Sequence, residues 1–323
     1  MYKMQTIENN TEVKREDVKE FYSKAALASQ PSLCCPTNYQ PEDVSHIPAD
    51  VLKISYGCGS PVSKASIKEG QTVVDLGSGG GIDCFIAAKT TGKNGKIIGI
   101  DMTDEMLSQA EKSRKFVEKK LGYSNIEFRK GVLEDIPVDS DSVDIIVSNC
   151  VINLSSIKHK VFEETYRILK NHGRLVISDI VSDSEVPEEM RSDKKLWGEC
   201  ISGAETQQNL IKTAKTAGFY GVSIEHDYVW KEVNGIKFSS ITFRGWKFTK
   251  GKECLYKGQY AIYKGPFQNV SDDDGHTYPA GEPVEICTDT ATKLSRQPYS
   301  GSFIIIDTSK KEEEIIECGP KCC

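Results

Sequence analysis

Short apolar runs alternate with longer mixed segments over residues 71–178, and this alternation limits the fold more than any other feature of the chain. Five runs rich in β-branched residues are expected to be strands: Thr72–Leu76, Lys96–Asp101, a run beginning at Ile126–Phe128, Val143–Asn149 and Arg174–Ser178. Helices are expected up to about Thr90, at Asp104–Lys120 and at Val161–Lys170. Because parallel strands need helical crossovers between them, this pattern predicts an α/β fold with a doubly wound, mostly parallel sheet.

The segments on either side of the alternation differ in character. Three parts are predicted: an N-terminal helical cap with Cys34 and Cys58 (1–70), a central domain (71–225), and a small β-rich C-terminal domain with a Cys-rich tail (226–323). The cap is expected to contain a helix at Asp17–Leu27. The central domain is expected to end with a helix that Pro187 opens towards Cys200 and another at Thr206–Ala217. The C-terminal strands are expected at Ser239–Phe243, Tyr260–Tyr263 and Phe303–Asp307.

The composition excludes several classes of protein. The 323 residues carry a net charge of -6 without a long basic run, so no nucleic-acid partner is expected. No apolar run is long enough to cross a bilayer, and Met1–Lys24 lacks the apolar core of a signal peptide. A cytoplasmic protein with no membrane partner is therefore expected. Eleven cysteines are many for such a chain, and clusters among them indicate metal binding or redox chemistry.

A glycine-rich loop, Asp75-Leu-Gly77-Ser78-Gly79, follows the first predicted strand. Glycine allows a tight turn and the close approach of a ligand to the backbone. A dinucleotide-binding fingerprint would need another glycine at position 82, which is isoleucine. The Asp-x-Gly-x-Gly form instead resembles the first motif of Rossmann-like methyltransferases that use S-adenosylmethionine. Asp75, Gly77, Ser78 and Gly79 are therefore candidate cofactor-binding residues.

Further candidates for the same site lie where the other predicted strands end. The carboxyl ends of parallel strands form the ligand side of such a sheet. Asp101 ends the second strand, where its carboxylate can accept hydrogen bonds from both ribose hydroxyls, and Met102 can pack against an adenine. Leu133 and Glu134 follow the third strand, and Asn149 ends the fourth. The sequence therefore predicts a nucleotide-type pocket at this edge.

Three cysteines occupy distinctive settings. Cys150 directly follows the fourth predicted strand, so its thiol is expected at the mouth of the ligand crevice. Cys58 lies between two glycines after Tyr56, and Cys200 ends the sequence Trp-Gly-Glu-Cys. The pattern leads to the hypothesis of a thiol cluster beside a nucleotide-type cofactor. The alternative is that each of the three is a small buried hydrophobic residue.

The other cysteines have simpler interpretations. Cys84 lies inside the first predicted helix of the alternation, where a core position is expected. Cys254 and Cys287 have no distinctive context and are interpreted as structural. The tail cysteines either capture soft metals or belong to a flexible segment: Cys318, Cys322 and Cys323.

Taken together, these motifs resemble the arsenite methyltransferase family over about residues 20–220. The motifs that carry the resemblance are Tyr56-Gly-Cys58-Gly, Asp75-Leu-Gly-Ser-Gly79, Asp101-Met-Thr-Asp104, Ser148-Asn-Cys-Val-Ile-Asn-Leu154, Tyr166-Arg-Ile-Leu-Lys170 and Trp197-Gly-Glu-Cys200. The resemblance implies a class I methyltransferase fold and S-adenosylmethionine as cofactor, with Tyr56 added to the cofactor-binding residues. The sequence departs from the family at Ile82, where many members carry an arginine, although Asp83 is retained.

The resemblance also implies roles for four cysteines. Those matching Cys58, Cys150 and Cys200 bind trivalent arsenic in that family, which suits a soft ion that prefers thiolates. Arsenic would then be the nucleophile, and no protein base need attack. Cys34, with Cys35 beside it, is the candidate for reducing pentavalent arsenic, and thioredoxin or a small thiol would reopen the resulting disulfide. The expected partners are therefore trivalent arsenicals and a thiol reductant.

Two other functions fit parts of the same pattern. A small-molecule C- or O-methyltransferase with structural cysteines predicts that loss of a thiol hardly changes turnover. A metalloid-binding protein that uses the thiols without chemistry leaves the glycine loop and Asp101 unexplained. Cofactor binding measured by calorimetry separates this second function from both enzymes.

Overall fold

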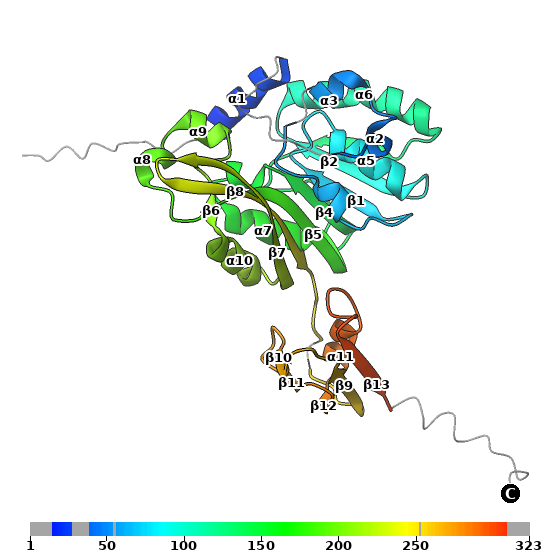
Figure 1. Cartoon of the computed structure of the whole chain (residues 1–323). Coiled ribbons are helices and arrows are strands. Elements are labelled where there is room, and N and C mark those ends of the chain that lie inside the picture. The colour runs from blue at the N-terminus through cyan, green and yellow to red at the C-terminus, as the bar shows by residue number, and fades with distance from the viewer. Residues whose placement is uncertain (1–14, 28–38, 54–55, 252, 309–323) are drawn as a thin grey trace, which may run out of the picture. The chain divides into compact units, whose positions relative to one another are not determined.

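The computed structural model describes residues 15–27, 39–53, 56–251 and 253–308. The chain divides into two compact units, Met1–Lys247 and Phe248–Cys323. The first unit, drawn from blue to yellow in Figure 1, contains the glycine loop and the three candidate arsenic-binding cysteines. Among the helices of the described ranges, none combines the length and the apolar character that a membrane span requires.

The first unit is built on an eight-stranded sheet. Its strands are β1 (Thr72–Leu76), β2 (Lys96–Asp101), β3 (Ile126–Lys130), β4 (Val143–Asn149), β5 (Leu169–Ser182), β6 (Glu205–Thr206), β7 (Tyr220–Val233) and β8 (Ile236–Trp246). Along the sheet the order is β3-β2-β1-β4-β5-β8-β7, and β6 pairs with β5. Strands β1 to β5 pair in parallel, whereas β8 is antiparallel to both β5 and β7. The predicted α/β fold with a mostly parallel sheet is confirmed.

The strand order reverses between β1 and β4, which are neighbours in the sheet. In an open α/β sheet a ligand crevice forms outside the carboxyl ends of the strands at such a reversal. The glycine loop follows β1, and Cys150 follows β4. The topology therefore brings the loop and the thiol to the two sides of one crevice.

Helices cover both faces of the sheet (Figure 1). The described helices of this unit are α1 (Arg15–Leu27), α2 (Pro41–Val44), α3 (Ala49–Lys53), α4 (Pro61–Lys64), α5 (Ile82–Thr91), α6 (Asp104–Leu121), η2 (Ile152–Leu154), α7 (Lys158–Ile168), α8 (Glu188–Arg191), α9 (Lys194–Gly198) and α10 (Gln207–Thr216). One apolar cluster joins Val74 to α7 and α10, and a second joins Val73 to α4, α5 and α6. Successive side chains of a strand point to opposite faces, so β1 contributes to both cores.

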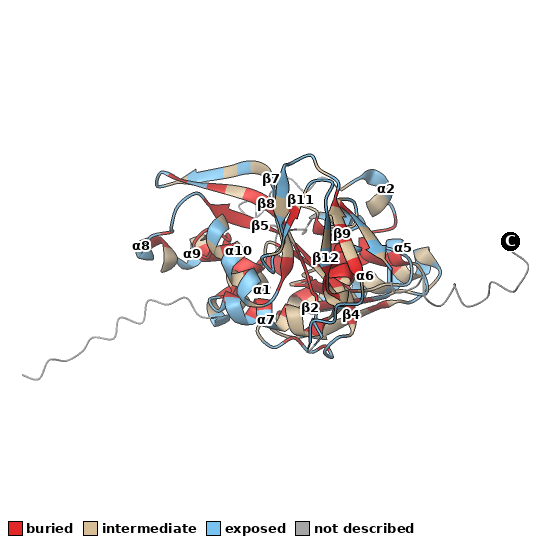
Figure 2. Ribbon diagram, turned by 90° about the horizontal axis from the view of Figure 1, so that it is seen from below, coloured by how far each residue is buried: buried red, intermediate tan, exposed pale blue. Residues whose placement is uncertain are grey.

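The two cores explain why the central strands lack polar alternation. Strand β4 and the second half of β5 are almost entirely buried, and Figure 2 shows buried residues concentrated along the middle of the sheet. Strands covered on both faces read as continuous apolar runs. Their bounds were therefore predictable, and β1, β2 and β4 begin and end at the predicted residues.

Two helices differ from the prediction. The helix expected from Pro187 towards Cys200 is two short helices, α8 and α9. The Asp193 side chain accepts hydrogen bonds from the backbone N–H groups of Lys195 and Leu196, which caps α9 and separates it from α8. Helix α7 ends at Ile168 rather than Lys170, because Leu169 already belongs to β5.

The predicted boundary after residue 225 is wrong. It falls inside β7, which forms a long antiparallel pair with β8 at the edge of the main sheet. Strand β8, including the run 239–243, pairs with β5 along nine residues and belongs to the first unit. The predicted cap also belongs to that unit, since Ala25 and Ala26 of α1 pack with Met106 of α6.

The second unit is β-rich, as predicted. Its elements are β9 (Gln259–Tyr263), β10 (Asn269–Ser271), β11 (Thr277–Pro279), β12 (Pro283–Ile286), α11 (Thr288–Leu294) and β13 (Phe303–Asp307). Strand β9 lies between β12 and β13 in an antiparallel sheet, and β10 pairs with β11. A small core around Tyr278 and Leu294 closes this unit.

Candidate active site

One large pocket lies at the carboxyl ends of the parallel strands, with about 1280 Å³ of empty volume, part of it open to solvent. All ten predicted cofactor-binding residues line it: Tyr56, Asp75, Gly77, Ser78, Gly79, Asp101, Met102, Leu133, Glu134 and Asn149. Cys150 and Cys200 line the same pocket, whereas Cys58 lies behind Cys150 and is fully buried. The structure therefore brings a thiol group and a nucleotide-type loop into one cavity.

The glycine loop is tied to the neighbouring strand. The backbone N–H groups of Gly77 and Ser78 both donate to the Ile100 carbonyl, at 2.8 and 2.9 Å. Gly77 has a φ of 69°, and a Cβ there would lie 2.4 Å from a methyl group of Val151. Only glycine fits this position, because both the backbone conformation and the space exclude a side chain. The loop thereby leaves its backbone open towards the pocket.

Two polar groups in the pocket suit a ligand with hydroxyl and amino groups. The Ser78 hydroxyl is buried and has no hydrogen-bond partner among the described residues, so a ligand donor or acceptor would satisfy it. The carboxylate of Asp101 accepts hydrogen bonds from the backbone N–H groups of Gly79 at 2.9 Å and Thr103 at 2.8 Å. Burial raises the pKa of Asp101, and these N–H groups oppose that shift. The carboxylate is thus held in one orientation at the pocket wall.

Helix α1 closes another side of the pocket, which no sequence pattern predicted. Arg15, Val18 and Tyr22 of α1 line the cavity. The Arg15 guanidinium lies 3.1 Å from Glu134, whose other oxygen accepts a 2.5 Å hydrogen bond from the Ser155 hydroxyl. Glu134 therefore has two protein partners, which fix its side chain at the pocket wall.

Two buried carboxyl groups lie beneath the glycine loop. Asp83 accepts hydrogen bonds from the Tyr39 hydroxyl at 3.0 Å and the Asn149 amide at 3.2 Å. Burial raises its pKa to about 6. Burial and the nearby Asp83 charge raise the pKa of Asp75 well above its usual range, and the Cys84 thiol donates to Asp75 at 3.3 Å. Cys84 is thus a fully buried residue of the core, as predicted.

Replacing Asp83 with asparagine is expected to flatten the dependence of stability on pH. Because the pKa of Asp83 is raised from 3.8 to about 6, the folded protein holds a proton that the unfolded chain has lost in this window. The free energy of unfolding of the wild type therefore falls as the pH rises from about 4 to 6, by ~3 kcal/mol from this group. Denaturant titrations of both proteins at pH 4, 5, 6 and 7 measure the difference. Parallel curves for wild type and variant would exclude a raised pKa.

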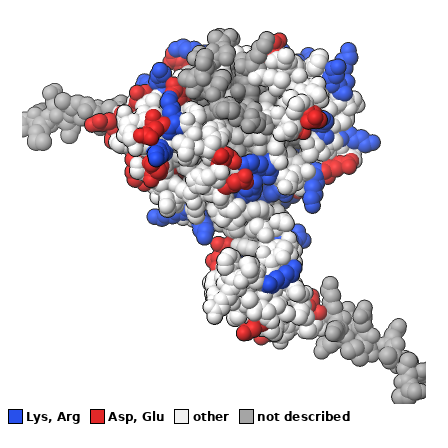
Figure 3. Space-filling model, viewed as in Figure 1, with Lys and Arg blue, Asp and Glu red and all other residues white. Residues whose placement is uncertain are grey.

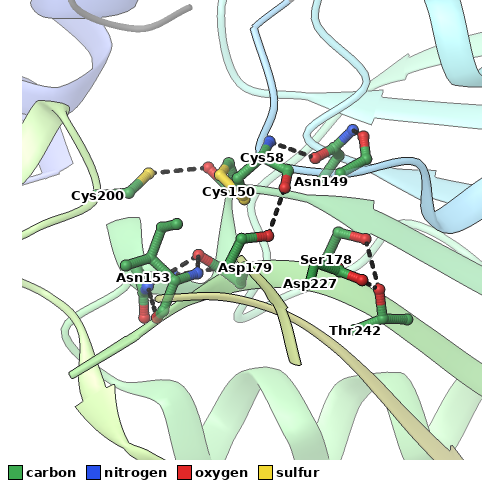
Figure 4. The surroundings of a disulfide bond; sticks show 12 residues. Cys58, Asn149, Cys150, Asn153, Ser178, Asp179, Cys200, Asp227 and Thr242 are labelled. Atoms are coloured by element: carbon green, nitrogen blue, oxygen red, sulfur yellow. Dashed lines mark hydrogen bonds between the residues drawn. A yellow bond between two sulfur atoms is a disulfide. The ribbon is translucent and has the colours of Figure 1, made fainter. Parts of the chain in front are cut away.

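The three candidate arsenic-binding cysteines come together from distant parts of the chain. A disulfide joins Cys58 and Cys150, with their Cα atoms 5.8 Å apart across 92 residues of sequence. The Cys200 thiol donates to the Cys150 carbonyl at 3.0 Å, and Figure 4 shows it directed towards the disulfide. Binding of a metalloid by Cys58 and Cys150 therefore first requires their two-electron reduction.

Backbone strain marks two of these cysteines. Cys150 has a φ of 56° and Cys200 a φ of 60°, a region that residues with a side chain rarely adopt. Such a conformation costs about 1–3 kcal/mol and persists only where the surrounding structure fixes it. The hydrogen bond from Cys150 N–H to the Ser178 carbonyl, at 2.8 Å, is one such constraint. Strain of this kind is concentrated at functional sites.

The Asn149 amide anchors the loop that carries Cys58. Its carbonyl oxygen accepts from the Cys58 N–H at 3.0 Å, and its amino group donates to the Gly59 carbonyl at 2.9 Å. The Ser240 hydroxyl donates to the Cys58 carbonyl at 2.5 Å. Cys58 is therefore held from both sides, although the glycines on either side of it would allow a flexible turn.

Replacing Gly57 with alanine is expected to destabilise the first unit by about 1–3 kcal/mol. A Cβ at this position would lie 2.6 Å from the Asn149 amide, which is itself buried and hydrogen-bonded. The matched control is the same change in an Asn149→Ala background, where the clashing group is missing and the cost should be smaller. Urea titrations of the four proteins give the comparison. An equal cost in both backgrounds would show that Asn149 does not determine the fit.

Two further groups surround the thiols and were not predicted. Asp179, at the carboxyl end of β5, has a carboxylate oxygen within 4.8 Å of the sulfur atoms of Cys58 and Cys150. Burial raises its pKa to about 6, and Asn153 donates to it at 2.8 Å. The Tyr22 hydroxyl donates to the Gly198 carbonyl at 3.1 Å, and burial together with Cys200 raises its pKa. Cys34 and Cys35 lie outside the described residues.

Comparison with known proteins separates the three candidate functions. An arsenite methyltransferase from Aquipseudomonas alcaligenes is 32% identical, over 94% of this chain and 94% of that protein. The human arsenite methyltransferase is also 32% identical, over 92% of this chain and 85% of its own length. The chain belongs to the arsenite methyltransferase family. A methyltransferase of another family is therefore excluded.

Solved structures and domain families agree with this membership of the arsenite methyltransferase family. The chain is similar to the crystal structure of an arsenic(III) S-adenosylmethionine methyltransferase from Chlamydomonas reinhardtii, with a TM-score of 0.63 and 32% identity. The match covers 87% of this chain and 97% of the Chlamydomonas chain. Residues 67–218 match a family described as a methyltransferase domain. Residues 250–322 match a domain of unknown function (DUF8838), and this match begins close to the boundary between the two units.

The departure at Ile82 is compatible with this arsenite methyltransferase fold. Ile82 begins α5, lines the pocket and is nearly buried, so it adds apolar wall where many family members carry an arginine. Asp83 keeps its partners Tyr39 and Asn149 and needs no arginine beside it. Ile82 therefore presents an apolar side chain to the pocket directly after the glycine loop.

Proposed function

We propose that this protein transfers methyl groups from S-adenosylmethionine to trivalent arsenic held by the thiolates of Cys58, Cys150 and Cys200. The observation that carries the proposal is that Cys150 and Cys200 line the same pocket as the glycine loop and Asp101. When the methyl donor and the thiol-bound arsenic are held in one cavity, the methyl group can pass directly from one to the other. Holding the reacting groups in this way supplies most of the catalysis when the donor is already activated.

The residues of the chain would bind and orient the two reactants. The glycine loop and Asp101 hold the cofactor, and the buried Ser78 hydroxyl offers it a further hydrogen bond. S-adenosylmethionine supplies a methyl group on a positively charged sulfur, so no protein group has to activate it. Three thiols replace three hydroxyls of arsenous acid, and three water molecules leave without a change of oxidation state. The arsenic lone pair then points away from the three sulfurs and is the nucleophile.

Reduction is needed before and after the transfer. The Cys58–Cys150 disulfide must accept two electrons and two protons before these thiols can bind arsenic. Transfer of the methyl group leaves arsenic pentavalent, and a further two electrons return it to the trivalent state. We assign the second pair of electrons to Cys34 and a second thiol, such as Cys35, which are oxidised to a disulfide. Thioredoxin or a small thiol then reduces this disulfide, and the same reductant opens the Cys58–Cys150 disulfide. This part of the proposal rests on the family resemblance of Cys34.

Incubation with S-adenosylmethionine, arsenite and a thiol tests the proposal, with arsenic species separated and identified by mass spectrometry. Methylated arsenicals should accumulate together with one S-adenosylhomocysteine for each methyl group transferred. Omission of the thiol should leave the Cys58–Cys150 disulfide closed and stop the reaction. Binding of both reactants without any methylated arsenic would reject the enzyme and favour a metalloid-binding protein.

A further inference from the structure

The second unit contains a pair of cysteines that the methyltransferase chemistry does not use. Cys254 is exposed and lies in the segment before β9, and Cys287 is buried directly before α11. They are the two cysteines among the described residues of this unit. A hydrogen bond joins their side chains, and no disulfide links them.

Backbone contacts hold the two thiols in this arrangement. The Leu255 carbonyl accepts hydrogen bonds from the backbone N–H and the hydroxyl of Thr288, at 2.8 and 3.1 Å. On the other side of Cys254, the Gly251 N–H donates to the Asp289 carboxylate at 2.6 Å. The residues flanking one cysteine are thus bound to the residues flanking the other. The pairing is built into the fold of the unit and is not a chance approach of an exposed side chain.

The two thiols also differ in acidity. Burial raises the pKa of Cys287, but hydrogen bonds from the Thr290 hydroxyl, from the backbone N–H groups of Thr290 and Asp289 and from Cys254 outweigh it and lower the pKa. The charge of Cys287 raises the pKa of the exposed Cys254. The buried Cys287 thiol is therefore the more acidic of the two, and the exposed Cys254 thiol is the more accessible. This is a suitable arrangement for ligation of a soft ion.

We propose that Cys254 and Cys287 form a second arsenic site, which binds a trivalent arsenical carrying one carbon substituent. Two thiols replace two hydroxyls of the arsenical: two As–O bonds break, two As–S bonds form, two water molecules leave, and arsenic stays trivalent. The carbon fills the third position, so two sulfurs complete the coordination. A zinc site needs four ligands, and the pair offers two. The site goes beyond the proposed function, although it rests on that function for its natural ligand, the singly methylated trivalent product.

Phenylarsine oxide tests the site, since it carries one carbon and bridges two neighbouring thiols. The full-length, reduced protein is treated with this reagent, digested with trypsin and examined by mass spectrometry. Cys254 and Cys287 lie in different tryptic peptides, residues 253–257 and 265–293. The expected product is these two peptides joined through one phenylarsenic group. In Cys254→Ser the bridge should be absent, and the affinity of this site should fall by about 10²-fold or more, because a single thiol no longer chelates.

Two controls keep the result interpretable. A Cys58→Ser/Cys200→Ser protein lacks the proposed catalytic site and should still give the bridged peptides. Its loss of arsenite methylation tests the proposed function, so the two proposals can fail separately. In the absence of phenylarsine oxide, a short bis-alkylating reagent should join the same two peptides, because it requires only that the two thiols lie close together. Joining by that reagent with no phenylarsenic bridge, or separate alkylation of both cysteines at saturating phenylarsine oxide, would overturn the second site.

Discussion

Replacing Cys150 or Cys200 with serine is expected to lower kcat/KM for arsenite by about 10³-fold or more, equivalent to ~4 kcal/mol. A serine hydroxyl is a hard, weak ligand for trivalent arsenic, and each change removes one of three soft ligands. Both thiols face the pocket, but the glycine loop and Asp101 do not depend on them. The affinity for S-adenosylmethionine should therefore stay within about twofold. Steady-state methylation rates and calorimetric cofactor titrations give the two values.

The matched control is Cys318→Ser, which removes a thiol of the Cys-rich tail that takes no part in the proposed methyl transfer. It should leave the initial rate of arsenite methylation unchanged. A methylated trivalent arsenical already carries one carbon and needs only two thiolates. One of the single serine variants of Cys58, Cys150 and Cys200 should therefore retain activity on that substrate. Wild-type rates on arsenite in the Cys150 and Cys200 variants would show that these thiols are not arsenic ligands.

Replacing Asp101 with alanine is expected to weaken S-adenosylmethionine binding by about 2–3 kcal/mol, or about 30- to 150-fold. The variant loses a half-buried carboxylate that faces the pocket and is held by the N–H groups of Gly79 and Thr103. Both the acceptors for the ribose hydroxyls and the orientation of the loop are lost together. Calorimetric titration with the cofactor measures the change.

Asp104→Ala provides the control for this prediction. Asp104 lies three residues further on, at the start of α6, and its exposed carboxylate pairs with Lys130 at 2.7 Å. It does not line the large pocket, and exposed ion pairs contribute little to stability. The cofactor affinity of this variant should equal that of the wild type. Equal affinity in folded Asp101→Ala would remove Asp101 from the cofactor site.

The sheet and the cofactor side of the pocket were predictable because local rules decide both. A strand buried on both faces must be a continuous apolar run, which fixed the bounds of β1, β2 and β4. The carboxyl ends of those strands must lie at one edge, which placed Asp101 and Asn149 in the pocket. The same rule could have found Asp179, which directly follows the predicted fifth strand at Ser178.

The errors occur where the outcome depends on distant contacts. Strand β7 is buried at only one residue and otherwise partly or fully exposed, so it carries no apolar run. Only its pairing with β8 assigns it to the main sheet. The burial of Cys58 depends on Asn149 and Ser240, which are 91 and 182 residues away. The closure of the pocket by Tyr22 likewise depends on packing of α1 that no local pattern reports.

The surface charge agrees with the composition. On the face of the first unit that Figure 3 shows, acidic and basic side chains are interspersed, with no broad basic area. Many charged side chains of the described residues form ion pairs, such as Arg244 with Glu225 at 3.2 Å and Lys170 with Asp144 at 2.9 Å.

X-ray absorption spectroscopy of the reduced protein with one equivalent of arsenite tests the central claim most directly, because it counts the atoms bound to arsenic. The wild type should show three sulfur neighbours, supplied by Cys58, Cys150 and Cys200. The Cys150→Ser protein, prepared in the same way, should show two sulfurs and an oxygen. Three sulfur neighbours in both proteins would mean that other cysteines hold the arsenic, and would contradict the assignment of these three thiols.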